Sequence, residues 1–185
     1  MILWYIPPMN QSSAGRLCAS LALLSLFGAF CTLIAAANTD KEPAPRFYAT
    51  TTAGEKFTNQ SIKGKVVLFE FWTTWCGYCA DEAEFVDQIA KEFSDKGLIV
   101  LAVNVGESKK TVRKYLDQHP RTIPIVLMED TNLAAMYQAN VYPIYVVVDR
   151  DGNIAGTQRG AGGERSLRRL LSRAGISSPD SDDDQ

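Results

Sequence analysis

Histidine is almost absent from this chain, which has one, His119, in 185 residues. A single histidine excludes metal sites built from several imidazoles and argues against a histidine-assisted catalytic triad. The chain also lacks a long basic run, because 19 Lys and Arg are balanced by 21 Asp and Glu, for a net charge of -2. Without a basic patch interleaved with aromatic residues, we do not expect nucleic acid as a partner.

Charge is missing altogether between Leu17 and Ala37. A run of about twenty apolar or small residues is long enough to cross a bilayer. The same run follows Arg16 and ends in three alanines, which is also the pattern of a secretory signal peptide. We therefore expect residues 1–37 to be a signal peptide or a transmembrane anchor. Both place the rest of the chain in the periplasm or otherwise outside the cytoplasm, either secreted or anchored in the inner membrane.

The chain has four cysteines, and their positions separate them into two pairs. Cys18 and Cys31 lie inside the apolar run, where cysteine behaves as a small hydrophobic residue. Only Cys76 and Cys79 remain in the exported part. An oxidising compartment makes a disulfide between these two chemically reasonable.

The remaining sequence divides into a polar, proline-bearing linker over 38–45, a folded domain over 46–175, and an acidic tail over 176–185 that we expect to be disordered. In the domain, alternation and a Gly54 turn predict a hairpin over 46–58. Apolar runs and a late turn predict strands over 66–72, 98–105, 123–128, 144–149 and 153–158. Helical spacing and capping residues predict helices over 79–93, 109–118, 132–140 and 166–174. This alternation predicts an α/β domain with helices on both faces of a sheet.

The motif TTWCGYC, at 73–79, lies where a buried strand gives way to a helix. Cys76 would sit at the helix N-terminus, where unpaired N–H groups and the helix dipole favour a thiolate and lower the pKa of the sulfur. Cys79, one turn later, could then attack a mixed disulfide and release the product. The pattern predicts Cys76 as nucleophile and Cys79 as the resolving thiol of a redox-active disulfide.

The cysteine pair could instead form a purely structural disulfide or bind a metal ion. A zinc site needs two more ligands, and no cysteine or second histidine is left to supply them. Copper binding by the two thiols and His119 is conceivable, although His119 lies far along the chain. Redox chemistry is the favoured interpretation, with no metal and no cofactor.

Beyond the cysteines, FEFWTTWCGYC and VYPIYVVVD resemble the thioredoxin superfamily. KGKVVLFEFWTTWC and AVNVGESK are similar to its TlpA/ResA branch of membrane-tethered periplasmic reductases. The resemblance covers about residues 45–175. It implies a thioredoxin-like α/β fold, with a central mixed sheet flanked by helices, and a protein-disulfide oxidoreductase.

The resemblance also implies roles for particular residues. Pro143 matches the family's cis-proline, which faces the two sulfurs across the groove in which substrate binds. The same groove would be lined by Trp75, Gly77, Tyr78 and Tyr142. Gly77 and Tyr78 form the dipeptide that affects redox poise, and they depart from the family pattern, so the direction of electron flow is not inherited.

Two glutamates are candidates for proton transfer or for tuning the thiol pKa. Glu82 matches a glutamate near the thiols of ResA-like proteins, although it could instead be a solvent-facing acid that complements the helix dipole. Glu70 lies mid-strand in VVLFEFW, so burial should raise its pKa and make it a proton acceptor for Cys79. If Glu70 were buried without compensation, Glu70→Leu would stabilise the fold; if it lay at an edge, it would reach water.

The function predicted first is an extracytoplasmic protein-disulfide reductase of the cytochrome c maturation type. It would take electrons from a membrane donor protein and act on protein thiol or disulfide clients such as apocytochrome c. A disulfide oxidase or isomerase is the main alternative, and a copper-binding module is a third. A thiol peroxidase is disfavoured, since its proline-rich loop with Thr and a lone cysteine is not found.

Overall fold

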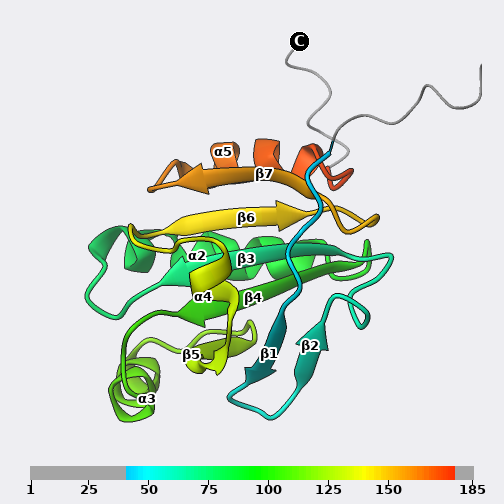
Figure 1. The fold of residues 1–185 in the computed structure, drawn as a ribbon. Helices are drawn as coiled ribbons and strands as arrows, with labels where there is room; N and C mark the ends of the chain where they lie inside the picture. Colours follow the sequence, from blue (N-terminus) through cyan, green and yellow to red (C-terminus); the bar gives the residue numbers. More distant parts are fainter. Residues whose placement is uncertain (1–40, 178–185) are drawn as a thin grey trace, which may run out of the picture. The chain divides into compact units, whose positions relative to one another are not determined.

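The structure is a computed structural model that describes residues 41–177. These residues form one seven-stranded sheet, in the order β2-β1-β5-β4-β3-β6-β7, with helices on both faces (Figure 1). The segment predicted to be a signal peptide or anchor, the first residues of the predicted linker and most of the predicted acidic tail lie outside the described residues. Within 41–177, no helix is long and apolar enough to cross a membrane.

Each strand and helix predicted from the sequence is present. The strands are β1 (Tyr48–Thr51), β2 (Lys56–Thr58), β3 (Val66–Trp72), β4 (Leu98–Asn104), β5 (Ile125–Thr131), β6 (Ile144–Val148) and β7 (Ile154–Arg159). The helices are α2 (Gly77–Glu92), α3 (Lys109–Gln118), α4 (Leu133–Met136) and α5 (Gly163–Ser172). The ends differ most for α4, which is shorter than predicted, for α5, which begins at Gly163 rather than Ser166, and for β5, which ends at Thr131 rather than Met128.

The sheet is mixed, as the resemblance implied. Strand β3 pairs in parallel with β4 and antiparallel with β6, and β4 pairs in parallel with β5. The hairpin of β1 and β2 is antiparallel and joins the sheet through β5. Strand β5 begins directly after Pro124, because proline has no N–H to give to a neighbouring strand. All seven residues of β3 are buried, so the continuous apolar run correctly marked the central strand.

The two faces of β3 belong to two halves of the core. Val66, Leu68 and Trp72 pack with residues of α2, α3 and α5, whereas Phe69 and Phe71 pack with residues of α4. Figure 1 shows α2 and α5 on one side of the sheet and α4 on the other. Because side chains alternate along a strand, Glu70 shares the face of Leu68 and Trp72, which is the face covered by α2.

The folded part is longer at both ends than the sequence predicts. The described end of the linker lies against the turn between β6 and β7, where Ala44 N–H donates to Gly152 O at 2.9 Å and Ile154 N–H donates to Glu42 O at 2.8 Å. At the other end, Ile176 is 1% exposed, although it was placed in the tail. Apolar burial and backbone pairing thus extend beyond the boundaries that composition marked.

Candidate active site

The cysteine pair forms a disulfide at the start of α2. The Cys76 and Cys79 sulfurs are 2.10 Å apart and their Cα atoms 5.3 Å apart. Cys76 is the N-cap of α2, and its Sγ accepts a hydrogen bond from the Cys79 N–H at 3.1 Å. After reduction the same N–H and the positive end of the helix dipole would stabilise negative charge on the Cys76 sulfur.

The groove predicted around Cys76 is present. A cavity of about 310 Å³ is lined by Trp75, Cys76, Gly77, Tyr78, Asn140, Val141 and Tyr142. Trp75 and Tyr78 are 70% and 69% exposed. The rings of Trp75 and Tyr142 meet edge to face, with centroids 5.7 Å apart. The structure therefore brings together Trp75, Gly77, Tyr78 and Tyr142 as predicted, and adds Asn140 and Val141, which no sequence signal singled out.

The peptide bond between Tyr142 and Pro143 is cis, which confirms the geometry that the resemblance implied. Pro143 is buried just before β6, and its carbonyl oxygen accepts a hydrogen bond from Gly160 N–H at 2.7 Å. Tyr142, rather than Pro143, lines the cavity beside Cys76. Partial burial, and then the negative charge of Glu107, raise the pKa of the Tyr142 hydroxyl.

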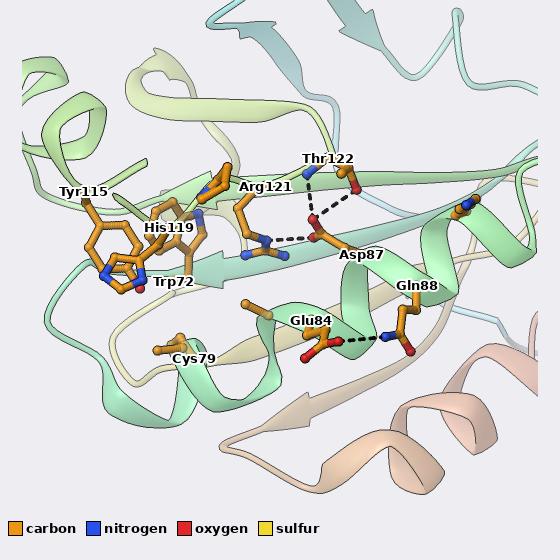
Figure 2. Close-up of a pocket in the computed structure, with 13 residues that line it drawn as sticks. Trp72, Cys79, Glu84, Asp87, Gln88, Tyr115, His119, Arg121 and Thr122 are labelled. Carbon is orange, nitrogen blue, oxygen red and sulfur yellow. Dashed lines mark hydrogen bonds and ion pairs between the residues drawn. The ribbon is translucent and has the colours of Figure 1, made fainter. Parts of the chain in front are cut away.

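Cys79 faces a second cavity, of about 440 Å³, between α2 and the end of α3 (Figure 2). Its aromatic wall is a series of three rings: Trp72 lies 5.7 Å from Tyr115, and Tyr115 stacks on His119 at 4.5 Å. His119, which is far from the cysteines in sequence, therefore shares a cavity with Cys79. No group of three or more metal-binding side chains occurs among residues 41–177.

Beneath this cavity lies a charged network centred on Arg121. Glu70 is 0% exposed, and its Oε2 accepts a hydrogen bond from Arg121 Nη2 at 2.9 Å. Arg121 Nε also donates to Asp87 Oδ1 at 2.7 Å, an ion pair visible in Figure 2. Burial raises the pKa of Glu70 above its ordinary 4.5, and Arg121 partly opposes that rise.

The prediction that Glu70 is buried is thus confirmed, and the edge-facing alternative is excluded. The premise that Glu70 is buried without compensation is wrong, because Arg121 supplies a counter-charge. The expected stabilisation by Glu70→Leu therefore loses its basis, since that change would leave the guanidinium with Asp87 alone. Sequence reasoning missed Arg121 and Asp87; the available signal was that a buried carboxylate needs a partner.

Glu82 does not face solvent, so the solvent-facing alternative is wrong. The residue is 4% exposed, and its Oε2 accepts a hydrogen bond from the Tyr145 hydroxyl at 2.8 Å. Its Oε1 accepts from the backbone N–H groups of Gly162 at 3.0 Å and Gly163 at 2.7 Å. One carboxylate thereby joins α2 to β6 and to the start of α5, in the turn that follows Cys79.

A third carboxylate holds the loop before Cys76. Glu107 Oε2 accepts hydrogen bonds from Thr74 N–H at 2.7 Å and from Asn104 Nδ2 at 2.8 Å, and Glu107 Oε1 accepts from the Thr74 hydroxyl. These bonds fix the entry to the active-site loop against the residues that precede α3. No motif in the sequence pointed to this contact.

A disulfide at a helix N-terminus, a cis Tyr142–Pro143 bond whose tyrosine lines the groove of Cys76, and a mixed sheet of this order define a thiol–disulfide oxidoreductase with a thioredoxin-like fold. Residues 39–171 match the Redoxin family, and the chain belongs to that family. Among curated proteins it is 35% identical to the thioredoxin-like protein YneN of Bacillus subtilis, over 70% of this chain and 77% of YneN.

The chain is also 32% identical to the thiol-disulfide oxidoreductase ResA of Bacillus subtilis, over 60% of this chain and 62% of ResA. The match thus spans less than two thirds of ResA. Among solved structures, a thiol:disulfide interchange protein of Chlorobium tepidum superposes with a TM-score of 0.63 at 25% identity, covering 75% of this chain and 99% of that one. StoA of Bacillus subtilis gives 0.60 at 22% identity, covering 69% and 97%. These likenesses confirm the thioredoxin fold and the TlpA/ResA-like branch.

Proposed function

We propose that the chain is an extracytoplasmic protein-disulfide reductase of the cytochrome c maturation type, and that it acts through Cys76 on client proteins. The observation that carries the proposal is the division of the two sulfurs between two cavities. Cys76 lines a groove with exposed aromatic rings, where a client chain can lie, whereas Cys79 lines a separate cavity between α2 and the end of α3. The attacking sulfur must reach the client, whereas the resolving sulfur needs to reach only Cys76.

In the reaction, the reduced Cys76 thiolate attacks one sulfur of a client disulfide, and the other client sulfur leaves as a thiolate that takes up a proton. The Cys79 thiol then loses its proton and attacks Cys76, which re-forms the Cys76–Cys79 disulfide and releases the second client thiol. Two electrons pass from the protein to the client. A membrane protein carrying a dithiol would return two electrons and complete the cycle.

Glu70 is proposed as the group that takes the Cys79 proton. Its carboxyl lies on the α2 face of β3, and its raised pKa brings it closer to the working pH, where a general base is most effective. Glu82 is proposed to tune the thiols indirectly, since its three hydrogen bonds fix the turn of α2 that carries Cys79. Trp75, Gly77, Tyr78 and Tyr142 would contact the client, next to Pro143.

The setting and the client class rest on sequence and relatives. The uncharged run over 17–37 supports export and attachment to, or passage across, a membrane. The relatives named thiol-disulfide oxidoreductase ResA support thiol–disulfide exchange with proteins. Apocytochrome c, with its paired cysteines, is the client that we propose to test first.

Trapping tests the assignment of the two sulfurs. Cys79→Ser should accumulate mixed disulfides between Cys76 and apocytochrome c, whereas Cys76→Ser should accumulate few. Equal trapping by the two variants would contradict the proposed roles. The reduction potential tests the direction: a value near the about -270 mV of thioredoxin supports a reductase, and a value near the about -120 mV of DsbA identifies an oxidase instead.

A further inference from the structure

Helix α3 presents an exposed cationic face. Val112 is buried in the core, and Tyr115 and Leu116 are half-buried on the same side. The cations of the helix are all exposed, and they comprise Lys109, Lys110, Arg113 and Lys114. Residues three or four positions apart are neighbours on a helix, so Lys109 and Arg113, and Lys110 and Lys114, lie side by side and form a single surface, called here the α3 basic face.

The stability of α3 does not explain these cations. None of the four forms an ion pair within residues 41–177. Lys109 and Lys110 occupy the first turn, which contains no acidic residue and where the helix dipole repels positive charge. The nearest acid along the exposed side is Asp117, in the last turn. The four cations are therefore free to meet charges from outside the chain, although the chain as a whole has a net charge of -2.

Both ends of helix α3 are tied to the part of the fold that carries the cysteines. Glu107, two residues before Lys109, is bonded to Thr74 in the active-site loop at 2.7 Å. Its charge also acts on the Tyr142 hydroxyl, which lines the groove. At the other end of the helix, Tyr115 contacts Trp72, the last residue of β3. Helix α3 is thus fastened to the active-site end of the sheet, and Glu107 itself already accepts three hydrogen bonds.

We propose that the α3 basic face docks an acidic segment of the redox partner protein while that partner's cysteine lies in the Cys76 groove. The inference rests on the proposed function and adds the chemistry of the partner, which must carry clustered Asp or Glu beside its reactive cysteine. Positive charge next to a reactive site raises the encounter rate with an anionic partner, and the gain falls as salt screens it.

The test compares two synthetic peptides, each with one intramolecular disulfide, which differ only in flanking glutamates or glutamines. The reduced full-length chain, the Lys109→Gln/Lys110→Gln/Arg113→Gln variant and a matched Arg165→Gln/Arg169→Gln/Arg173→Gln variant are assayed for kcat/KM. The matched variant removes the same number of exposed charges from α5. At about 0.01 M ionic strength the α3 variant should lose about tenfold on the glutamate peptide and nothing on the glutamine peptide.

The loss should shrink toward none at about 0.15 M salt, and the α5 variant should retain wild-type rates. Equal losses in the α3 and α5 variants, or equal losses on both peptides, would overturn the docking proposal. A third result would also overturn it: an α3 variant that reduces both peptides at the wild-type rate but binds phosphatidylglycerol vesicles more weakly than wild type does, with phosphatidylcholine vesicles as the uncharged control. The face would then serve a membrane. Failure of wild type to reduce even the glutamine peptide would count against the proposed function instead.

Discussion

Replacing Arg121 by methionine probes the charged network below Cys79. Methionine keeps much of the apolar stem of arginine but removes the guanidinium, whose side chain is 6% exposed. Glu70, at 0% exposed, would lose the one cation that is hydrogen-bonded to it within residues 41–177 and would take up a proton in the folded state. The energetic penalty is then set by protonation rather than by a buried charge.

The magnitude follows from the ordinary pKa of 4.5 for this carboxyl. Holding such a group neutral at pH 7 costs about 3.4 kcal/mol, at about 1.36 kcal/mol per pH unit, and at pH 5 it costs less than about 1 kcal/mol. The first figure is an upper bound, because burial already raises the pKa of Glu70 in the wild type. Asp87 is 15% exposed and keeps its bonds to Thr122, so its share is small.

The sign of the pH dependence follows from the raised pKa. A carboxyl whose folded pKa exceeds its unfolded pKa contributes stability that is fully present below the unfolded pKa and is lost as pH rises through the folded pKa. Arg121→Met should raise the pKa of Glu70 further, so the window of loss extends upward from about 4.5. The variant should therefore lose up to about 3 kcal/mol at pH 7 and little at pH 5.

Urea denaturation at the two pH values, with the disulfide intact, measures the difference. The double variant Glu70→Gln/Arg121→Met provides the control, because a neutral amide has no proton to gain; at pH 7 it should be more stable than Arg121→Met alone. An Arg121→Met variant that loses the same free energy at both pH values, and is not rescued by Glu70→Gln, would refute the argument and point to packing.

Substitutions at Glu82, Ser108 and Trp75 test other parts of the structure. Glu82→Ala removes the acceptor for three hydrogen bonds and should lower the unfolding free energy by about 3 kcal/mol or more. Tyr145→Phe removes only one of these bonds and should cost about 1 kcal/mol. Equal urea midpoints for the two variants would show that the bonds to Gly162 and Gly163 contribute nothing. Ser108→Ala removes the side-chain cap that accepts from Thr111 N–H and should cost about 1 kcal/mol in thermal unfolding, with Ser108→Gly costing less. Trp75→Ala, at a 70% exposed position, should leave stability within about 0.5 kcal/mol while reducing turnover of a protein client; unchanged turnover would remove Trp75 from the groove's function.

Local pattern predicted most of the fold because burial and periodicity are local properties. The run VVLFEFW identified the central strand, and the junction at the cysteine pair identified a helix that starts there, at Gly77 rather than at the predicted Cys79. The boundaries at the linker and the tail were less accurate. Composition describes how polar a segment is, and it does not show that Ala44 or Ile176 packs on the domain.

The partners of the buried acids were not predictable from local pattern. Glu70 and Arg121 are 51 residues apart, and Glu82 and Gly163 are 81 apart. The strand pattern showed that Glu70 would be buried but not which of many cations would meet it. His119 was not expected to be a neighbour of the cysteines because it is far from them along the chain. At the end of helix α3, however, it lines the same cavity as Cys79. Such pairs are formed by the way in which the strands and helices are arranged in the fold, which local sequence patterns do not reveal.

The position of each sulfur links these observations to the two half-reactions. Cys76 shares its groove with the half-buried Tyr142 and the exposed rings of Trp75 and Tyr78, and none of the Arg121 network lines that groove. Cys79 shares its cavity with Arg121 and Asp87, and no groove aromatic lines that cavity. Substitutions in the groove should therefore alter formation of the mixed disulfide, whereas substitutions in the network should alter its resolution. Single-turnover kinetics separate the two steps, and a groove variant that slowed only resolution would contradict this division.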